Sequence, residues 1–246
     1  GDRHPDTVVL INSMCLLLKV MDKPEEARPL LEEALQEKRE TLGDRHPDTL
    51  ASINNMCGLL VDMGKPEEAM TLLEEALQGC RATLGDRHPH TLISLNNMGA
   101  LLKEMGKLEE ARTLYEEALQ GRRETLGDRH PDTLMSINNM GRLLMNMGKL
   151  EAAKPLYEEA LQARRATLGD RHPQTLTSIG NMGDLLEHQG MLAEAIPFFT
   201  EELEGLVSLH GMEFQETRES AEHLAELLRK SNRHEEANAL AAKHEL

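Results

Sequence analysis

The sequence is poor in aromatic residues, cysteine and basic charge. Aromatic residues make up only 2 % of the 246-residue chain, tryptophan is absent, and there are three cysteines. Three cysteines are too few for a disulfide-stapled scaffold and favour a reducing compartment, so we expect a cytoplasmic protein. Twenty-seven Lys and Arg against 43 Asp and Glu give a net charge of −16, which argues against nucleic-acid binding. Apolar runs are only a few residues long, so no membrane-spanning segment is expected.

What the sequence has in abundance is repetition. The motif Gly-Asp-Arg-His-Pro occurs five times at a spacing of 42 residues, beginning at Gly1, Gly43, Gly85, Gly127 and Gly169. A sixth, shorter repeat begins at Gly211 and keeps Thr217 in the register of Thr49. Because the chain starts with Gly inside the motif, we expect it to be a fragment. We predict one domain, 1–246, built from stacked repeats at 1–42, 43–84, 85–126, 127–168, 169–210 and 211–246.

Each repeat is predicted to fold as two antiparallel helices. In residues 43–84, Pro47 can occupy the first turn of a helix, where its missing N–H costs nothing. Apolar residues then recur at steps of three and four, and Gly64 is expected to cap that helix. A second apolar stripe begins after Pro66 and ends before Gly85. No segment alternates with period two, so strands are not expected. We predict an all-α fold, a right-handed α-solenoid of six helix-turn-helix repeats with a concave and a convex face.

Two features depart from the regular pattern. The last repeat carries many charged residues, namely Glu219, Glu222, Glu226, Arg229 and Lys230. We interpret it as a degenerate polar cap that keeps the end of the array soluble. Three second helices contain a proline about one turn inside their predicted start, at Pro29, Pro155 and Pro197. There we expect a small bend or a later start of the helix.

The repeated residues resemble tetratricopeptide repeats, specifically the 42-residue kind found in kinesin light chains. In the fourth repeat the matching positions are Met140, Gly141, Leu144, Gly148, Leu150, Ala153, Tyr157, Ala160 and Leu161. The small residue expected at a helix contact recurs as Ala27, Ala69, Ala111, Ala153, Ala195 and Ala237. This resemblance implies a protein-interaction scaffold, with the first helices lining an inner groove and the second helices on the outside.

Asparagine recurs in the middle of the first helices, where it is a poor helix former. The first position of each pair is Asn12, Asn54, Asn96 and Asn138, and the second is Asn55, Asn97, Asn139 and Asn181. The resemblance implies that such side chains hold the main chain of a bound peptide. The alternative is that one Asn of each pair bonds structurally to the neighbouring repeat.

Some first-helix positions vary while their neighbours stay fixed, which indicates freedom from core packing. One such column holds Leu16, Gly58, Ala100, Arg142 and Asp184, and another holds Lys19, Val61, Lys103, Met145 and Glu187. The predicted groove therefore runs from apolar and mildly basic in early repeats to acidic in late ones. The alternative is drift on an unused surface. The candidate peptide-binding residues are Asn12, Asn54, Asn96, Asn138, Leu16, Lys19, Val61, Lys103, Arg142 and Met145.

Metal binding and catalysis are not expected. The histidine column is His4, His46, His88, His130 and His172. Equivalent atoms of stacked repeats lie about 10 Å apart, whereas ligands of one zinc ion converge within about 2 Å of it. We therefore interpret the histidines as structural linker residues. The Asp-Arg-His motif offers no nucleophile, so we predict a protein that is not an enzyme and uses no cofactor.

The leading functional hypothesis is a scaffold that binds a peptide or protein partner in the groove of the first helices. The alternative is a structural array that associates end to end, with no dedicated peptide ligand. Its motivation is the apolar face of the first predicted helix, which carries Val9, Leu16 and Leu17 and has no polar cap.

Overall fold

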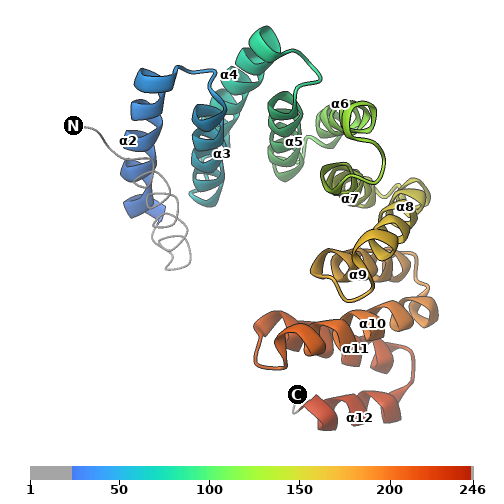
Figure 1. The fold of residues 1–246 in the computed structure, drawn as a ribbon. Helices are drawn as coiled ribbons and strands as arrows, with labels where there is room; N and C mark the ends of the chain where they lie inside the picture. Colours follow the sequence, from blue (N-terminus) through green and yellow to red (C-terminus); the bar gives the residue numbers. More distant parts are fainter. Residues whose placement is uncertain (1–23, 245–246) are drawn as a thin grey trace. The chain divides into compact units, whose positions relative to one another are not determined.

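The computed structural model describes residues 24–244, which form helices joined by turns, with no strand in that range (Figure 1). The first helices of the repeats are α3 (Pro47–Asp62), α5 (Pro89–Glu104), α7 (Pro131–Asn146), α9 (Pro173–His188) and α11 (Gln215–Lys230). The second helices are α2 (Pro24–Leu42), α4 (Pro66–Leu84), α6 (Leu108–Leu126), α8 (Leu150–Leu168), α10 (Leu192–His210) and α12 (His234–His244). The predicted all-α solenoid fold is confirmed. The proposed self-association surface at Val9, Leu16 and Leu17 lies outside the described residues.

The chain divides into two compact units, Gly1–Gly127 and Asp128–Leu246, called unit 1 and unit 2 below. In unit 1, consecutive helices from α2 to α6 pack against each other, and α3 also touches α5. In unit 2, consecutive helices from α7 to α12 pack in the same way, and α7 also touches α9. Within each unit, the described helices therefore bury their apolar stripes against the helices that precede and follow them.

The turn between the two helices of a repeat is a Schellman motif. Gly64 has a φ of +71°, which favours glycine. Its N–H donates to the Val61 carbonyl at 2.9 Å, and the Lys65 N–H donates to the Leu60 carbonyl at 2.8 Å. In the last repeat Asn232 takes the place of the glycine at a φ of 60°, and the Arg233 N–H completes the same bond to the Leu228 carbonyl.

These turns predict that substitutions at two equivalent positions, Gly64 and Asn232, have different effects on the free energy of unfolding. Gly64→Ala should lower the free energy of unfolding by about 1 to 2 kcal/mol, because a Cβ is strained at positive φ. Asn232→Gly should leave that free energy unchanged or raise it, since it removes the same strain. Urea unfolding followed by circular dichroism measures both. Equal losses from both variants would contradict the assigned turn geometry.

The linker motif between repeats caps the following helix. His46 Nδ1 accepts a hydrogen bond from the Asp48 N–H at 3.2 Å, and Pro47 fills the first turn. Thr49 is fully buried, and its Oγ1 donates to the Gly43 carbonyl at 2.8 Å. The repeated Gly, His, Pro and Thr are thus explained by local backbone bonding, which is the structural role expected for the histidines.

The prolines inside second helices do not delay the start of those helices. Helices α2, α8 and α10 begin at Pro24, Leu150 and Leu192, five residues before Pro29, Pro155 and Pro197 respectively. The expectation of a later helix start is therefore wrong. The reason is that a proline removes one backbone donor, while the flanking residues still pack their apolar stripe.

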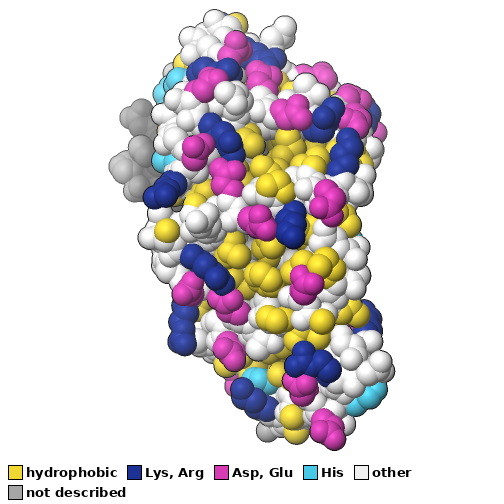
Figure 2. All heavy atoms as spheres, turned by 90° about the vertical axis from the view of Figure 1, so that its right-hand side faces the viewer, with side chains coloured by type: hydrophobic (Ala, Val, Ile, Leu, Met, Phe, Trp, Pro, Cys, Tyr) yellow, Lys and Arg dark blue, Asp and Glu magenta, His cyan; other side chains and the backbone are white. Residues whose placement is uncertain are grey.

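Arginines near the ends of second helices join one repeat to the next. Arg81 Nη2 lies 2.6 Å from Glu117 Oε1, and its Nε lies 3.3 Å from Asp86. Arg165 repeats this geometry with Glu201 and Asp170. Figure 2 shows Lys and Arg side chains beside Asp and Glu on one face of the molecule. Because these pairs are solvent-exposed, each adds little stability, and their main effect is to leave the outer carboxylates already paired.

Candidate functional site

A pocket of about 410 Å³ lies in unit 1 between the first helices α3 and α5, with α4 behind it. We call it the α3–α5 pocket. Small residues create the space, because Gly58 and Ala100 occupy the variable column and nothing lies within 4 Å of where a Cβ on Gly58 would be. Its lining consists of Asn54, Cys57, Gly58, Val61, Asp62, Leu73, Asn97, Ala100, Leu101 and Glu104.

Asn54 supplies the pocket with a polar atom that has no partner. Its side chain is half-buried, and its Oδ1 is buried without a hydrogen-bond partner. A buried acceptor left unpaired costs free energy that a donor from outside would recover. Asn97 lines the same pocket from the next repeat. Of the candidate residues from the sequence, Asn54 and Val61 are therefore brought together here.

Asn96 and Asn138 are more deeply placed, with exposed fractions of 9 % and 7 %. When the Asn138 amide is oriented with its oxygen toward Arg164, that oxygen accepts hydrogen bonds from the guanidinium at 2.5 and 3.3 Å. Arg164 Nη1 also donates to Ser178 Oγ at 2.7 Å and to the Gln174 carbonyl at 3.0 Å. Asn138 is thus bonded to Arg164 of its own repeat, not directly to the neighbouring repeat as the structural alternative proposed, and a ligand could use its oxygen only in competition with Arg164.

The remaining candidate residues lie elsewhere. Lys103 and Met145 are half-buried on α5 and α7, and Arg142 is exposed on α7. None of the three is among the residues that line the α3–α5 pocket. Asn12, Leu16 and Lys19 lie outside the described residues. Ligand binding by these six residues therefore stays a prediction.

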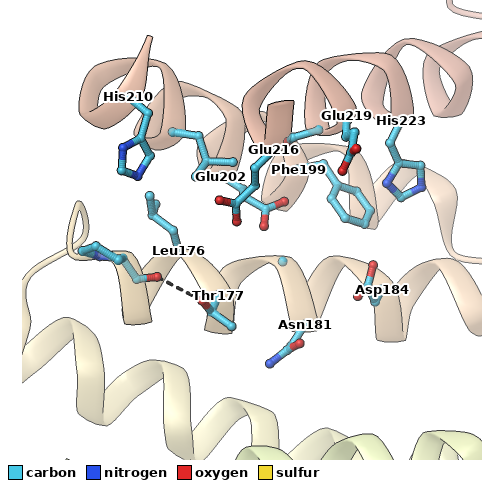
Figure 3. Close-up of a pocket in the computed structure, with 14 residues that line it drawn as sticks. Leu176, Thr177, Asn181, Asp184, Phe199, Glu202, His210, Glu216, Glu219 and His223 are labelled. Atoms are coloured by element: carbon cyan, nitrogen blue, oxygen red, sulfur yellow. Dashed lines mark hydrogen bonds between the residues drawn. The ribbon is translucent and has the colours of Figure 1, made fainter. Parts of the chain in front are cut away.

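A second pocket, of about 450 Å³, lies in unit 2 between α9, α10 and α11 (Figure 3). We call it the acidic pocket. Its apolar side is formed by Leu176, Phe199 and Leu206 among others. Its titratable residues are Asp184, Glu202, His210, Glu216, Glu219 and His223. The late part of the predicted groove was expected to be acidic from Asp184 and Glu187. The other carboxylates of the pocket were not foreseen.

Glu202 fits into this pocket because the residues at two facing positions of the repeat differ together from those in the preceding repeats. In the four preceding repeats its column holds alanine, at Ala34, Ala76, Ala118 and Ala160. The facing column on the first helix holds Asn54, Asn96 and Asn138 in the three preceding repeats but Gly180 here. A Cβ on Gly180 would overlap the Glu202 carboxylate. Loss of one side chain thus makes room for the other, and this Ala-to-Glu change is the sequence signal that could have located the pocket.

Burial controls the ionisation of the carboxylates. Desolvation raises the pKa of Glu202 to about 7, and repulsion from Asp184 and Glu216 adds to the shift. Burial also raises the pKa of Asp184 above its ordinary value. His223 Nε2 lies 2.8 Å from Glu187 Oε2, so this imidazole is already engaged by a carboxylate outside the pocket. The arrangement gathers negative charge that is only partly neutralised within unit 2.

Within residues 24–244, no group of three or more His, Cys, Asp or Glu side chains is arranged to hold a metal ion. Over the same residues, no helix combines the length and apolar character that crossing a membrane requires. Cys57 and Cys80 are both buried free thiols, and desolvation raises the pKa of each.

Comparisons with known proteins agree with the fold. The family model described as tetratricopeptide repeat matches residues 49–124, 92–144 and 132–206, and a second model of the same description matches residues 16–48. A comparison with curated proteins finds no match.

Solved structures give the same result. A point-substituted form of a putative kinesin light chain with nearly identical TPR-like repeats, from Podosopora anserina, is 25 % identical. That match covers 85 % of this chain and 98 % of the other, with a TM-score of 0.69. BtubC (BKLC) from P. vanneervenii is 18 % identical, over 90 % of this chain and 89 % of its own, with a TM-score of 0.79, which shows a shared fold. The chain therefore belongs to the tetratricopeptide-repeat family, in its kinesin-light-chain-like form.

Proposed function

We propose that this protein is a non-catalytic interaction scaffold that binds an extended segment of a partner protein on the first helices of unit 1. The observation that carries the proposal is the Asn54 Oδ1 atom, which is buried at the α3–α5 pocket and has no hydrogen-bond partner. Tetratricopeptide repeats typically mediate protein–protein interaction, and this supports a binding role over an enzymatic one.

The pocket combines two kinds of contact that an extended peptide needs. Amides from Asn54 and Asn97 face it from two consecutive repeats, and they can pair with the peptide main chain. Val61, Leu73 and Leu101 form an apolar wall that can receive a side chain of the peptide. No aromatic residue lines the pocket, so we expect modest affinity, with a Kd of about 1 to 100 μM.

Peptide display on the full chain, followed by binding measurements, tests the proposal. A peptide selected on the wild-type protein should lose at least about tenfold in affinity, or about 1.4 kcal/mol, in the double variant Asn54→Ala and Asn97→Ala. The matched control is Gln78→Ala with Gln120→Ala, because these amides are exposed on the second helices α4 and α6. Calorimetry measures the affinities, and thermal unfolding checks that each variant folds.

The outcome depends on which pair of amides matters. Equal affinities of the wild-type protein and the Asn54/Asn97 variant would contradict the proposal, as would a loss confined to the Gln78/Gln120 control. If the Asn54/Asn97 variant unfolds, the two asparagines belong to the structural core, and the proposal is wrong.

A further inference from the structure

We propose that the acidic pocket of unit 2 binds the guanidinium group of an arginine side chain presented by a partner protein. This inference extends the proposed peptide-binding function from unit 1 to unit 2 and names the chemistry of the partner there. Three independent features of the pocket support it: a joint within the same unit that already holds an arginine, a set of unpaired carboxylates, and a buried serine hydroxyl without a partner.

The joint between the fourth and fifth repeats shows how this fold holds a guanidinium. Arg164 on α8 bonds Ser178 on α9, and its guanidinium also faces Asn138 on α7. At the next joint the corresponding positions are Leu206, Ser220 and Gly180. The serine is kept, while the arginine and the asparagine are replaced by residues without a polar side chain. All three residues line the acidic pocket, so the pocket occupies the region where an internal arginine lies one repeat earlier.

The retained serine now lacks its partner. Ser220 Oγ is buried and accepts or donates no hydrogen bond within the described structure. Asn181, only 8 % exposed, is also unpaired at its Nδ2, but this amide nitrogen is a donor that a guanidinium cannot satisfy, and its side chain points away from the Glu202 and Glu216 carboxylates (Figure 3). Buried polar atoms are rarely left unpaired in folded proteins, and unpaired ones call for an explanation. An incoming guanidinium would supply Ser220 with the kind of donor that Ser178 receives from Arg164.

The carboxylates of the pocket match a planar cation. Glu202 and Glu216 form no hydrogen bond or ion pair with any described residue, although Figure 3 shows their carboxylates close to each other. Asp184 faces the same space from α9 and repels Glu202. Two carboxylates around one guanidinium can each accept a pair of its five N–H groups. The apolar side formed by Leu176 and Phe199 would cover the methylene stem of an arginine.

The space that accommodates the Glu202 side chain also indicates a preformed binding site. Glu202 replaces the alanine of four other repeats, and Gly180 removes the side chain that would overlap it. A buried carboxylate beside two others is unfavourable unless a cation joins it. Burial accordingly raises the pKa of Glu202, and a bound guanidinium would lower that pKa again.

The test uses the full chain and two capped probes, acetyl-Gly-Ser-Arg-Ser-Gly-amide and the same peptide with citrulline in place of arginine. Citrulline keeps the shape of arginine and loses its charge. Titrations followed by nuclear magnetic resonance should show that the arginine probe shifts the backbone amide signals of Gly180 and Ser220. The citrulline probe should bind at least about tenfold more weakly, because the charge-assisted bonds are lost.

Three variants sharpen the result. Glu202→Ala restores the residue of four other repeats, so it should fold, and it should weaken the arginine probe at least about tenfold. Leu206→Arg should also block the probe, because it supplies the guanidinium from within the chain. Glu204→Gln is the charge control: Glu204 is exposed on the same helix, is not among the pocket residues, and should leave binding unchanged.

Equal binding of the two probes, or full affinity of the Glu202→Ala variant, would overturn the inference. The arginine-probe test can fail independently of the proposed function, because the Asn54/Asn97 variant changes unit 1 alone. If that variant loses its selected peptide but keeps the arginine probe, both proposals stand. If the selected peptide still depends on Asn54 and Asn97 while the arginine probe never binds, only this inference fails.

Discussion

Gly141→Ala is expected to lower the free energy of unfolding by about 3 kcal/mol, although it adds a single methyl group. A Cβ on Gly141 would lie 2.6 Å from Tyr157 Cε1, and the tyrosine is only 1 % exposed. Because the ring is enclosed, it cannot move away without displacing its neighbours. The strain should therefore outweigh the gain in helix propensity, which is about 1 kcal/mol for glycine to alanine.

The chain provides its own control for this prediction. Gly58→Ala adds the same methyl group to a helix at a place with nothing within 4 Å, so it should raise the free energy of unfolding by about 1 kcal/mol. Urea unfolding by circular dichroism measures both. A second control is Gly141→Ala combined with Tyr157→Leu. Cys57 carries a side chain in the same column, where Leu73 replaces the tyrosine. The combined variant should lose less than the sum of the single losses. A stabilising Gly141→Ala would contradict this packing.

Glu202→Gln is expected to stabilise unit 2 at neutral and alkaline pH and to have little effect in acid. Burial raises the pKa of Glu202 from 4.5 to about 7 in the folded protein. A carboxyl group with a raised folded pKa binds its proton more tightly when folded. Its contribution to stability is therefore complete below the unfolded pKa and is lost as the pH rises through the folded pKa. Glutamine has nearly the volume of glutamate and does not ionise, so the variant avoids this loss of stability at high pH.

The difference in free energy of unfolding between Glu202→Gln and the wild type should grow by about 2 to 3 kcal/mol between about pH 4.5 and about pH 8. Asp184, Glu216 and Glu219 also face the pocket, as do His210 and His223, so only the difference between the two proteins isolates Glu202. Glu204→Gln, an exposed change on the same helix, should show a constant difference. A constant difference for Glu202→Gln as well would mean that the carboxylate is hydrated in the folded protein.

Much of the fold could be predicted because repetition makes local rules visible. A single Pro47 or Gly64 is weak evidence for a helix boundary, but five equivalent positions fix the period, and the period fixes the helices. The expected cap at Gly64 lies one residue beyond the C-cap Met63 of α3. The later start suggested by Pro29 is wrong because tertiary packing of the apolar stripe keeps the helix intact on both sides of the proline.

The candidate sites were less predictable, because a site depends on which neighbours touch. Asn54 and Asn138 occupy the same column, yet Asn54 has an unpaired oxygen at a pocket, while Asn138 faces Arg164. The difference comes from the partner column on the second helix, where Cys80 stands in place of Arg164. The acidic pocket shows the same effect, since Glu202 matters only because Gly180 faces it. Comparison of single columns misses such pairs, whereas comparison of facing columns would find them.

The most direct test of the account is to map the bound peptide on the protein. Nuclear magnetic resonance of the full chain with a display-selected peptide reports which backbone amides change. We predict that the changes in unit 1 concentrate on α3 and α5, at Asn54, Val61, Asn97 and Ala100, which line one pocket. Changes confined to the exposed faces of α4 and α6, with those four amides unaffected, would contradict the claim that the first helices form the binding surface.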